Sequence, residues 1–132
     1  MSTILLVEDQ AICREPLAKL LRYEGFNVAA ASNGVEAMQI LNDRPIDLLL
    51  LDLILPKLSG LALFEQIRRE PRWSELPVIV VTGVMDSSQI AHVVLELNAK
   101  EVFSKMRFSL DDLMKVIRES IPCAAQETTG RP

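Results

Sequence analysis

Five short apolar runs recur along this chain of 132 residues, and several of them contain no polar residue at alternate positions. The runs cover residues 4–7, 28–30, 48–51, 78–81 and 102–103. A strand without polar alternation is buried on both faces, as in a parallel sheet that helices cover on each side. The runs therefore favour an α/β fold.

The segments between these runs carry helical signals. Asn33 with Glu36 is typical of a helix cap and its return partner, and Ser109 with Asp112 resembles a capping box. Pro16 lies inside the first expected helix and removes a backbone hydrogen bond there, so that this helix kinks or starts late; we favour the kink. Apolar residues at helical spacing predict the other helices: Met38 and Leu41; Phe64 and Ile67; Ile90, Val94 and Leu97; Leu110, Leu113, Met114, Ile117 and Ile121.

Strands that alternate with helices predict a (βα)5 unit, in which right-handed crossovers build a doubly wound, parallel, five-stranded sheet. The expected strand order is 2-1-3-4-5, with ligands at the carboxyl ends of strands 1 and 3, where the winding direction reverses. We expect one domain over residues 1–121. Residues 122–132 have little to bury and are expected to form a flexible tail or the start of a linker.

Composition excludes several classes of protein. The net charge of −4 argues against direct binding of nucleic acid. No apolar run is long enough to span a bilayer, and no secretory signal is visible at the N-terminus. Cys13 and Cys123 are too few for a disulfide scaffold and lack metal-ligand spacing. We therefore expect two reduced thiols in a cytoplasmic protein.

Polar residues follow four of the apolar runs directly or nearly so. Glu8 and Asp9 follow the first run, Asp52 the third, Thr82 the fourth and Lys105 the fifth. A carboxylate such as Asp52 at the end of a buried strand is costly unless something partners it. The carboxyl ends of parallel strands meet at one edge, so the sequence predicts one polar site there.

The chemistry of this site follows from its charges. Three neighbouring carboxylates repel one another, whereas hard oxygen ligands with room for water suit Mg²⁺. The metal ligands would be Asp9, Asp52, the backbone carbonyl of Ile54, and Glu8 through water. A carboxylate so placed can attack a phosphoryl group and form an acyl phosphate.

The remaining groups match the charge on a transferred phosphoryl group. Its three oxygens would be taken by Mg²⁺, by Lys105 as a point charge, and by Thr82 as a hydrogen-bond donor. Each polar residue at the predicted edge then has a role.

These residues closely resemble the receiver domain of two-component response regulators, over about residues 3 to 121. The resemblance is carried by Glu8-Asp9, the run Asp52-x-x-x-Pro56-x-x-x-Gly60, Thr82 and Lys105. It also contributes to the strand order given above, which is flavodoxin-like.

The resemblance implies that a histidine kinase or phosphotransfer protein donates a phosphoryl group to Asp52 in a Mg²⁺-dependent reaction. Thr82 would then move toward the phosphoryl group and shift the surface of the fourth helix, fifth strand and fifth helix. That surface would bind a partner, an output domain or a second copy. Beyond phosphoryl transfer to itself and slow self-dephosphorylation, no enzymatic activity is expected.

The chain departs from the family pattern at two places. Met106 follows Lys105 where the family has proline with a cis bond, so we expect a trans bond or a strained loop here. Val102 occupies the position of the family's switch aromatic, with Phe103 beside it. These departures keep open a phosphorylation-independent docking module, a pseudo-receiver, as the alternative.

An enzymatic function is a weaker interpretation of this site than a receiver. A phosphatase with an aspartyl intermediate needs a general acid near the nucleophile, and Leu53 and Ile54 offer none.

His92 lies off the apolar face of its helix and is expected to be an exposed surface histidine. Trp73 is expected to pack down onto the protein rather than to bind a ligand.

Overall fold

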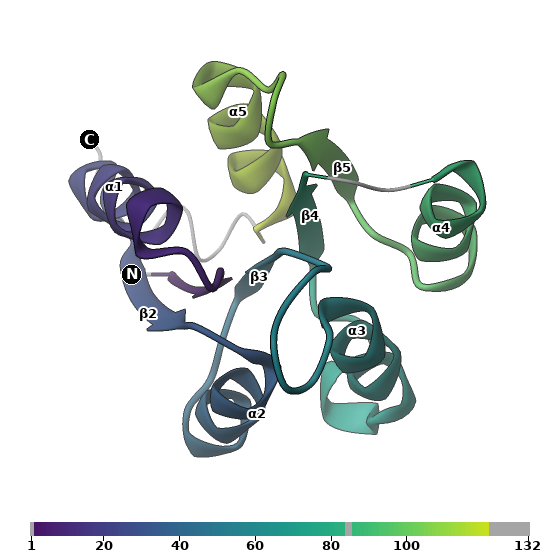
Figure 1. Cartoon of the computed structure of the whole chain (residues 1–132). Coiled ribbons are helices and arrows are strands. Elements are labelled where there is room, and N and C mark those ends of the chain that lie inside the picture. The colour runs from purple at the N-terminus through teal and green to yellow at the C-terminus, as the bar shows by residue number, and fades with distance from the viewer. Residues whose placement is uncertain (1, 84–85, 122–132) are drawn as a thin grey trace.

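The five strands form one parallel sheet in the order β2-β1-β3-β4-β5 (Figure 1). The structure, a computed structural model, describes residues 2–83 and 86–121. Cys123 and the expected tail lie outside these residues. The strands are β1 (Thr3–Val7), β2 (Asn27–Ala31), β3 (Leu48–Leu51), β4 (Val78–Thr82) and β5 (Glu101–Ser104). The predicted fold class and strand order are confirmed.

Helices cover both faces of the sheet, with α1 and α5 on one face and α2, α3 and α4 on the other (Figure 1). The helices are α1 (Ala11–Tyr23), α2 (Gly34–Asp43), α3 (Gly60–Arg69), α4 (Ser87–Ala91) and α5 (Leu110–Ser120). A 3₁₀ turn η1 (Pro71–Trp73) follows α3, and a π-turn η2 (His92–Glu96) continues α4. Among the described residues, no helix is long and apolar enough to cross a membrane.

Burial on both faces explains the unalternated apolar runs. Leu49 and Leu51 of β3 pack in the core beneath α2, α3 and α4, whereas Leu48 and Leu50 pack in the core beneath α1 and α5. All four side chains are buried. Successive side chains of a strand point to opposite faces, so a strand covered on both sides must be apolar at every position.

The helix caps predicted from the sequence are present, but the Glu36 side chain binds a different partner from the one expected. The Asn33 side chain accepts a hydrogen bond from the Glu36 N–H, as predicted. The Glu36 carboxylate, however, accepts from the backbone N–H and the hydroxyl of Ser32 rather than returning to Asn33. Ser109 accepts from the Asp112 N–H and starts α5.

Pro16 lies inside α1, which begins at Ala11. The alternative in which this helix starts late is therefore wrong, and the kink stays a prediction. Proline cannot donate to the carbonyl of Ile12, four residues earlier. Ile12 is exposed, so water can satisfy this carbonyl.

The predicted apolar face of the fourth helix is partly wrong. Leu97 is buried as expected, but Val93 is buried in place of Val94, and both Ile90 and Val94 remain exposed. The cause is the π-turn, in which the Leu97 N–H reaches back five residues to the His92 carbonyl. This wider turn changes the phase of the helix, and a 3.6-residue period cannot anticipate it.

The prediction that His92 is an exposed surface histidine is wrong. Its ring is half-buried between two helices, with Nε2 2.9 Å from Glu65 Oε2 and Nδ1 3.2 Å from Glu96 Oε1. Trp73 packs against the core, as predicted, although it lies in the turn η1 rather than in an irregular loop. The guanidinium carbon of Arg72 lies over the Trp73 ring, 4.5 Å from its centroid.

The segment after β5 confirms one expectation about the departures from the family pattern. The described residues contain no cis peptide bond, so the bond between Lys105 and Met106 is trans. Val102 packs toward the core beneath α2, α3 and α4, whereas Phe103 packs on the opposite side against Phe108, with ring centroids 6.0 Å apart. Phe103 therefore supports the loop that leads into α5.

Candidate functional site

Register along the sheet brings the predicted polar residues to one edge. Val7 of β1 lies beside Leu51 of β3, so Glu8 and Asp52, the next residues, lie at the same level. Thr82 ends β4 beside Ser104 of β5, and Lys105 follows directly. The shared edge of parallel strands thus assembles the site as the sequence predicts.

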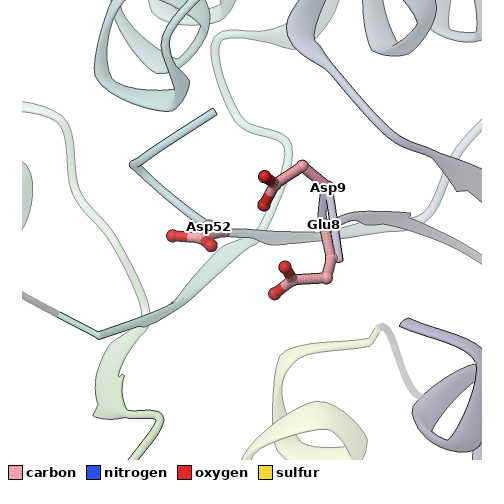
Figure 2. Close-up of side chains that lie close together, drawn as sticks. All are labelled: Glu8, Asp9 and Asp52. Atoms are coloured by element: carbon pink, nitrogen blue, oxygen red, sulfur yellow. The ribbon is translucent and has the colours of Figure 1, made fainter. Parts of the chain in front are cut away.

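Three carboxylates cluster at this edge (Figure 2). One oxygen each from Glu8, Asp9 and Asp52 lies within 4.8 Å of the other two. Glu8 and Asp52 are only 6% and 4% exposed, whereas Asp9 is exposed. Two buried acids beside a third, open one form a pocket that a cation can reach from solvent.

Lys105 neutralises part of this charge. Its Nζ lies 2.6 Å from Glu8 Oε1 and 2.8 Å from Asp52 Oδ2. Burial alone would lower the pKa of Lys105, but the hydrogen bonds to Asp52 and Glu8 outweigh burial and hold this pKa well above its ordinary value. The raised pKa favours the charged ammonium, and three ionised carboxylates with one ammonium carry two net negative charges.

The Asp52 carboxylate is held on both of its oxygens. Oδ2 faces Lys105, while Oδ1 accepts hydrogen bonds from the Ile54 N–H and the Thr82 hydroxyl, each at 3.0 Å. Thr82 is itself buried. These contacts explain how the strand end carries a charge at a depth where an unpartnered carboxylate would be costly.

The Glu8 side chain is fixed in a similar way. Its Oε2 accepts from the Gln10 N–H at 3.0 Å, and its Oε1 meets Lys105. Every buried polar side-chain atom of the described segments has a hydrogen-bond partner. The site is thus a charged but satisfied cluster, with the open carboxylate of Asp9 at its rim.

The donor set fits a hard divalent cation. Carboxylate oxygens close together with access to water are what Mg²⁺ requires, and two net negative charges balance its charge. The five side chains predicted to act on a phosphoryl group or a metal all lie at this edge: Glu8, Asp9, Asp52, Thr82 and Lys105. The sequence reasoning missed Arg14, whose guanidinium contacts the loop that carries Glu8 and Asp9.

A small apolar cavity of about 340 Å³ opens beside the site, between α1 and α5. Glu8, Asp52 and Lys105 line one end of it, and side chains such as Pro16 and Phe108 line the rest. The charged cluster therefore sits against a largely apolar wall, in which electrostatic contacts are stronger than in water.

Comparison with known proteins gives one consistent result. The model of the response regulator receiver domain family matches residues 4–118. The sensory transduction protein RegX3 of Mycobacterium tuberculosis is 39% identical over 119 residues, which cover 89% of this chain and 50% of RegX3. The response regulator RR06 of Streptococcus pneumoniae is 34% identical over 118 residues, covering 89% of this chain and 52% of that protein. The chain thus spans about half the length of these relatives.

Solved structures agree with this result. A response regulator receiver protein from Pseudomonas putida is 30% identical and has a TM-score of 0.82. The match covers 89% of this chain and 96% of that one. The response regulator TrrA from Thermotoga maritima, solved in complex with Mg²⁺ and BeF, is 29% identical, with a TM-score of 0.75 over 92% of this chain and 100% of that one.

Proposed function

The chain belongs to the family of response regulator receiver domains, and on that premise we propose that Asp52 accepts a phosphoryl group from a histidine kinase or a phosphotransfer protein. The observation that carries the proposal is the placement of the Asp52 carboxylate. It is buried, lies beside two further acids, and is held by both Lys105 and Thr82. No other carboxylate of the cluster has this set of partners.

The reaction transfers the group from a phosphohistidine. An oxygen of the Asp52 carboxylate forms a new bond to phosphorus, the P–N bond breaks, and the histidine nitrogen keeps the electron pair. The product is an acyl phosphate on Asp52. We place this exchange in the cytoplasm, as the sequence leads us to expect.

Mg²⁺ would be held by Asp9, Asp52, the backbone carbonyl of Ile54, and Glu8 through water. When bound, it supplies positive charge that offsets the charge of the incoming phosphoryl group. Lys105 presents its ammonium to a second phosphoryl oxygen, and Thr82 turns its hydroxyl from Asp52 Oδ1 to a third. Both residues already contact Asp52, so Lys105 would act from its present position and Thr82 after a short movement.

The movement of Thr82 would couple the site to α4, β5 and α5. Thr82 ends β4 beside β5, and residue 86 begins the cap of α4. Phosphorylation would shift the population between two states of this surface, to the extent that the phosphoryl group binds one state more tightly. A partner, an output domain or a second copy of the chain would read the change.

A mass measurement tests the proposal. The protein is incubated with Mg²⁺ and phosphoramidate, and its intact mass is recorded beside those of Asp52→Asn and Asp43→Asn, in which an exposed acid of α2 is changed. We expect wild type and Asp43→Asn to gain one phosphoryl group, and Asp52→Asn or an EDTA-treated sample to gain none. A wild type that gains no mass would leave the phosphorylation-independent docking module as the function.

A further inference from the structure

We propose that Arg14 is a positioning residue that holds Asp9 in place for the phosphoryl transfer proposed above, on which this inference rests. Its guanidinium binds the two backbone carbonyls that flank the peptide unit of Asp9. It would thereby fix the direction in which the Asp9 carboxylate faces Asp52.

Asp9 differs from the other two acids in how it is held. Glu8 and Asp52 each accept hydrogen bonds on both carboxylate oxygens. Within residues 2–83 and 86–121, no hydrogen bond or ion pair reaches the side chain of Asp9, which is exposed. Its position at the rim therefore depends on its backbone.

Arg14 supplies that backbone restraint. Its Nη1 donates to the Glu8 carbonyl at 2.8 Å and lies 3.4 Å from the Asp9 carbonyl. The first carbonyl belongs to the peptide that enters Asp9, and the second to the peptide that leaves it. A single guanidinium that contacts both restricts rotation of the segment between them, and hydrogen bonds from a charged donor are the stronger ones.

Besides Arg14, the loop is restrained by the Gln10 N–H, which donates to Glu8 Oε2 at 3.0 Å. The Glu8 N–H donates to the Ala31 carbonyl and anchors the strand side. On the helix side, Gln10 caps α1 without a side-chain hydrogen bond, and no acid lies in the first turn. The loop thus depends more on Arg14 than a well-capped helix start would.

The location of Arg14 is itself unusual for a cation. Positive charge near a helix N-terminus is disfavoured by the helix dipole, and Arg14 is only the fourth residue of α1. The carbonyl contacts and the nearby acids offset this cost. Arg14 is also half-buried, so its side chain is more confined than that of a solvated arginine.

Removal of Arg14 has two effects that can be measured separately. Loss of positive charge strengthens the attraction of Mg²⁺ and changes the concentration needed for half-saturation. Loss of the restraint misplaces Asp9 and lowers the rate of phosphorylation even when Mg²⁺ is saturating. Only the second effect is expected of a positioning residue.

The test compares Arg14→Met, Arg14→Lys and, as a matched control, Arg22→Met. Arg22 lies at the other end of α1 and binds the Val28 carbonyl, so the control makes the same change of charge away from the site. Phosphorylation by phosphoramidate is followed over a Mg²⁺ titration. Amide hydrogen exchange at Gln10, whose N–H donates to Glu8 Oε2, is measured without metal or phosphodonor.

In Arg14→Met, we expect the rate at saturating Mg²⁺ to fall about tenfold and the Gln10 amide to exchange faster. Arg14→Lys should recover part of both losses, and Arg22→Met should match wild type. The proposal is overturned if Arg14→Met keeps the wild-type saturating rate and the wild-type exchange, whatever happens to the half-saturating concentration of Mg²⁺.

The two readouts also separate this inference from the proposed function. If the wild type is not phosphorylated, the proposed function fails, while the exchange measurement still decides whether Arg14 restrains the loop. If the wild type is phosphorylated and the variants do not differ in rate or exchange, only the role of Arg14 fails.

Discussion

The Lys105 ammonium lies 2.8 Å from Asp52 Oδ2, so the proposed phosphoacceptor is already ion-paired in the described structure. The same ammonium reaches Glu8 at 2.6 Å. One cation thus joins the ends of three strands, β1, β3 and β5. Its charge lowers the free-energy cost of burying the Glu8 and Asp52 carboxylates at the edge of the sheet.

Replacement of Lys105 tests how much this pairing stabilises the fold. Without Mg²⁺, we expect Lys105→Met to lower the free energy of unfolding by about 2 kcal/mol, less than for a fully buried pair because Lys105 is 22% exposed. Urea unfolding with EDTA and then with excess Mg²⁺ measures this loss, and Mg²⁺ should reduce it. An equal loss in both conditions, or a loss no larger than that of the exposed Lys100→Met, would contradict the account.

Thr82 provides a second test, through its hydrogen bond to Asp52 Oδ1. Thr82→Val keeps the shape but leaves that oxygen with one donor fewer, so unfolding free energy should fall by about 1.5 kcal/mol. Thr82→Ser keeps the hydroxyl and should lose less. Amide NMR with Mg²⁺ and beryllofluoride should show shifts across α4 and β5 in Thr82→Ser and only near Asp52 in Thr82→Val. Full shifts in the valine variant would separate Thr82 from the switch.

His92 predicts a pH dependence of stability. The hydrogen bond to Glu65 raises the pKa of His92 above its ordinary 6.5; burial opposes this shift, and Glu96 adds to it. A raised folded pKa means that the stabilisation is complete below pH 6.5 and is lost as pH rises through the folded pKa.

The measurement is the difference in urea midpoint between wild type and His92→Gln over pH 5.5 to 9, a range set by the ordinary histidine pKa of about 6.5. The difference should be largest at the acid end and shrink toward the alkaline end. Glu65→Gln should flatten the profile, because it removes the main partner of the imidazolium. A difference that grows with pH would show that neutral His92 is the stabilising form.

Lys57 adopts a left-handed backbone conformation, with φ of 65°. This residue lies in the loop after Asp52. In a left-handed conformation, residues with a side chain, asparagine excepted, are strained because their Cβ comes too close to the backbone. We expect Lys57→Gly to raise the free energy of unfolding by about 0.5–1 kcal/mol. Lys57→Ala, which removes the charge but keeps the strain, is the control. A glycine variant no more stable than the alanine variant would show that the loop is not strained.

The sequence predicts the site well because the argument depends only on where apolar runs end. Asp52 and Lys105 follow strands whose carboxyl ends must meet in a parallel sheet, whatever the details of packing. The caps at Asn33 and Ser109 were equally accessible, because a cap is a local pattern.

What the sequence did not reveal depends on contacts between elements. Val93 replaces Val94 in the core because of a π-turn that has no known sequence signal here. The partner of His92 on α3 lies 27 residues away in the chain, and the contact of Arg14 depends on a side-chain rotamer. A cation at the fourth residue of α1, near the helix N-terminus, was the hint that the sequence offered for Arg14.

The central claim is that Asp52 itself carries the phosphoryl group. Borohydride reduces an aspartyl phosphate to homoserine, so the protein is treated with Mg²⁺ and phosphoramidate, reduced, digested and sequenced by mass spectrometry. We predict homoserine at position 52 alone, and none when EDTA is present. Homoserine at position 9, a reduced side chain at position 8, or no reduced residue at all would contradict the account.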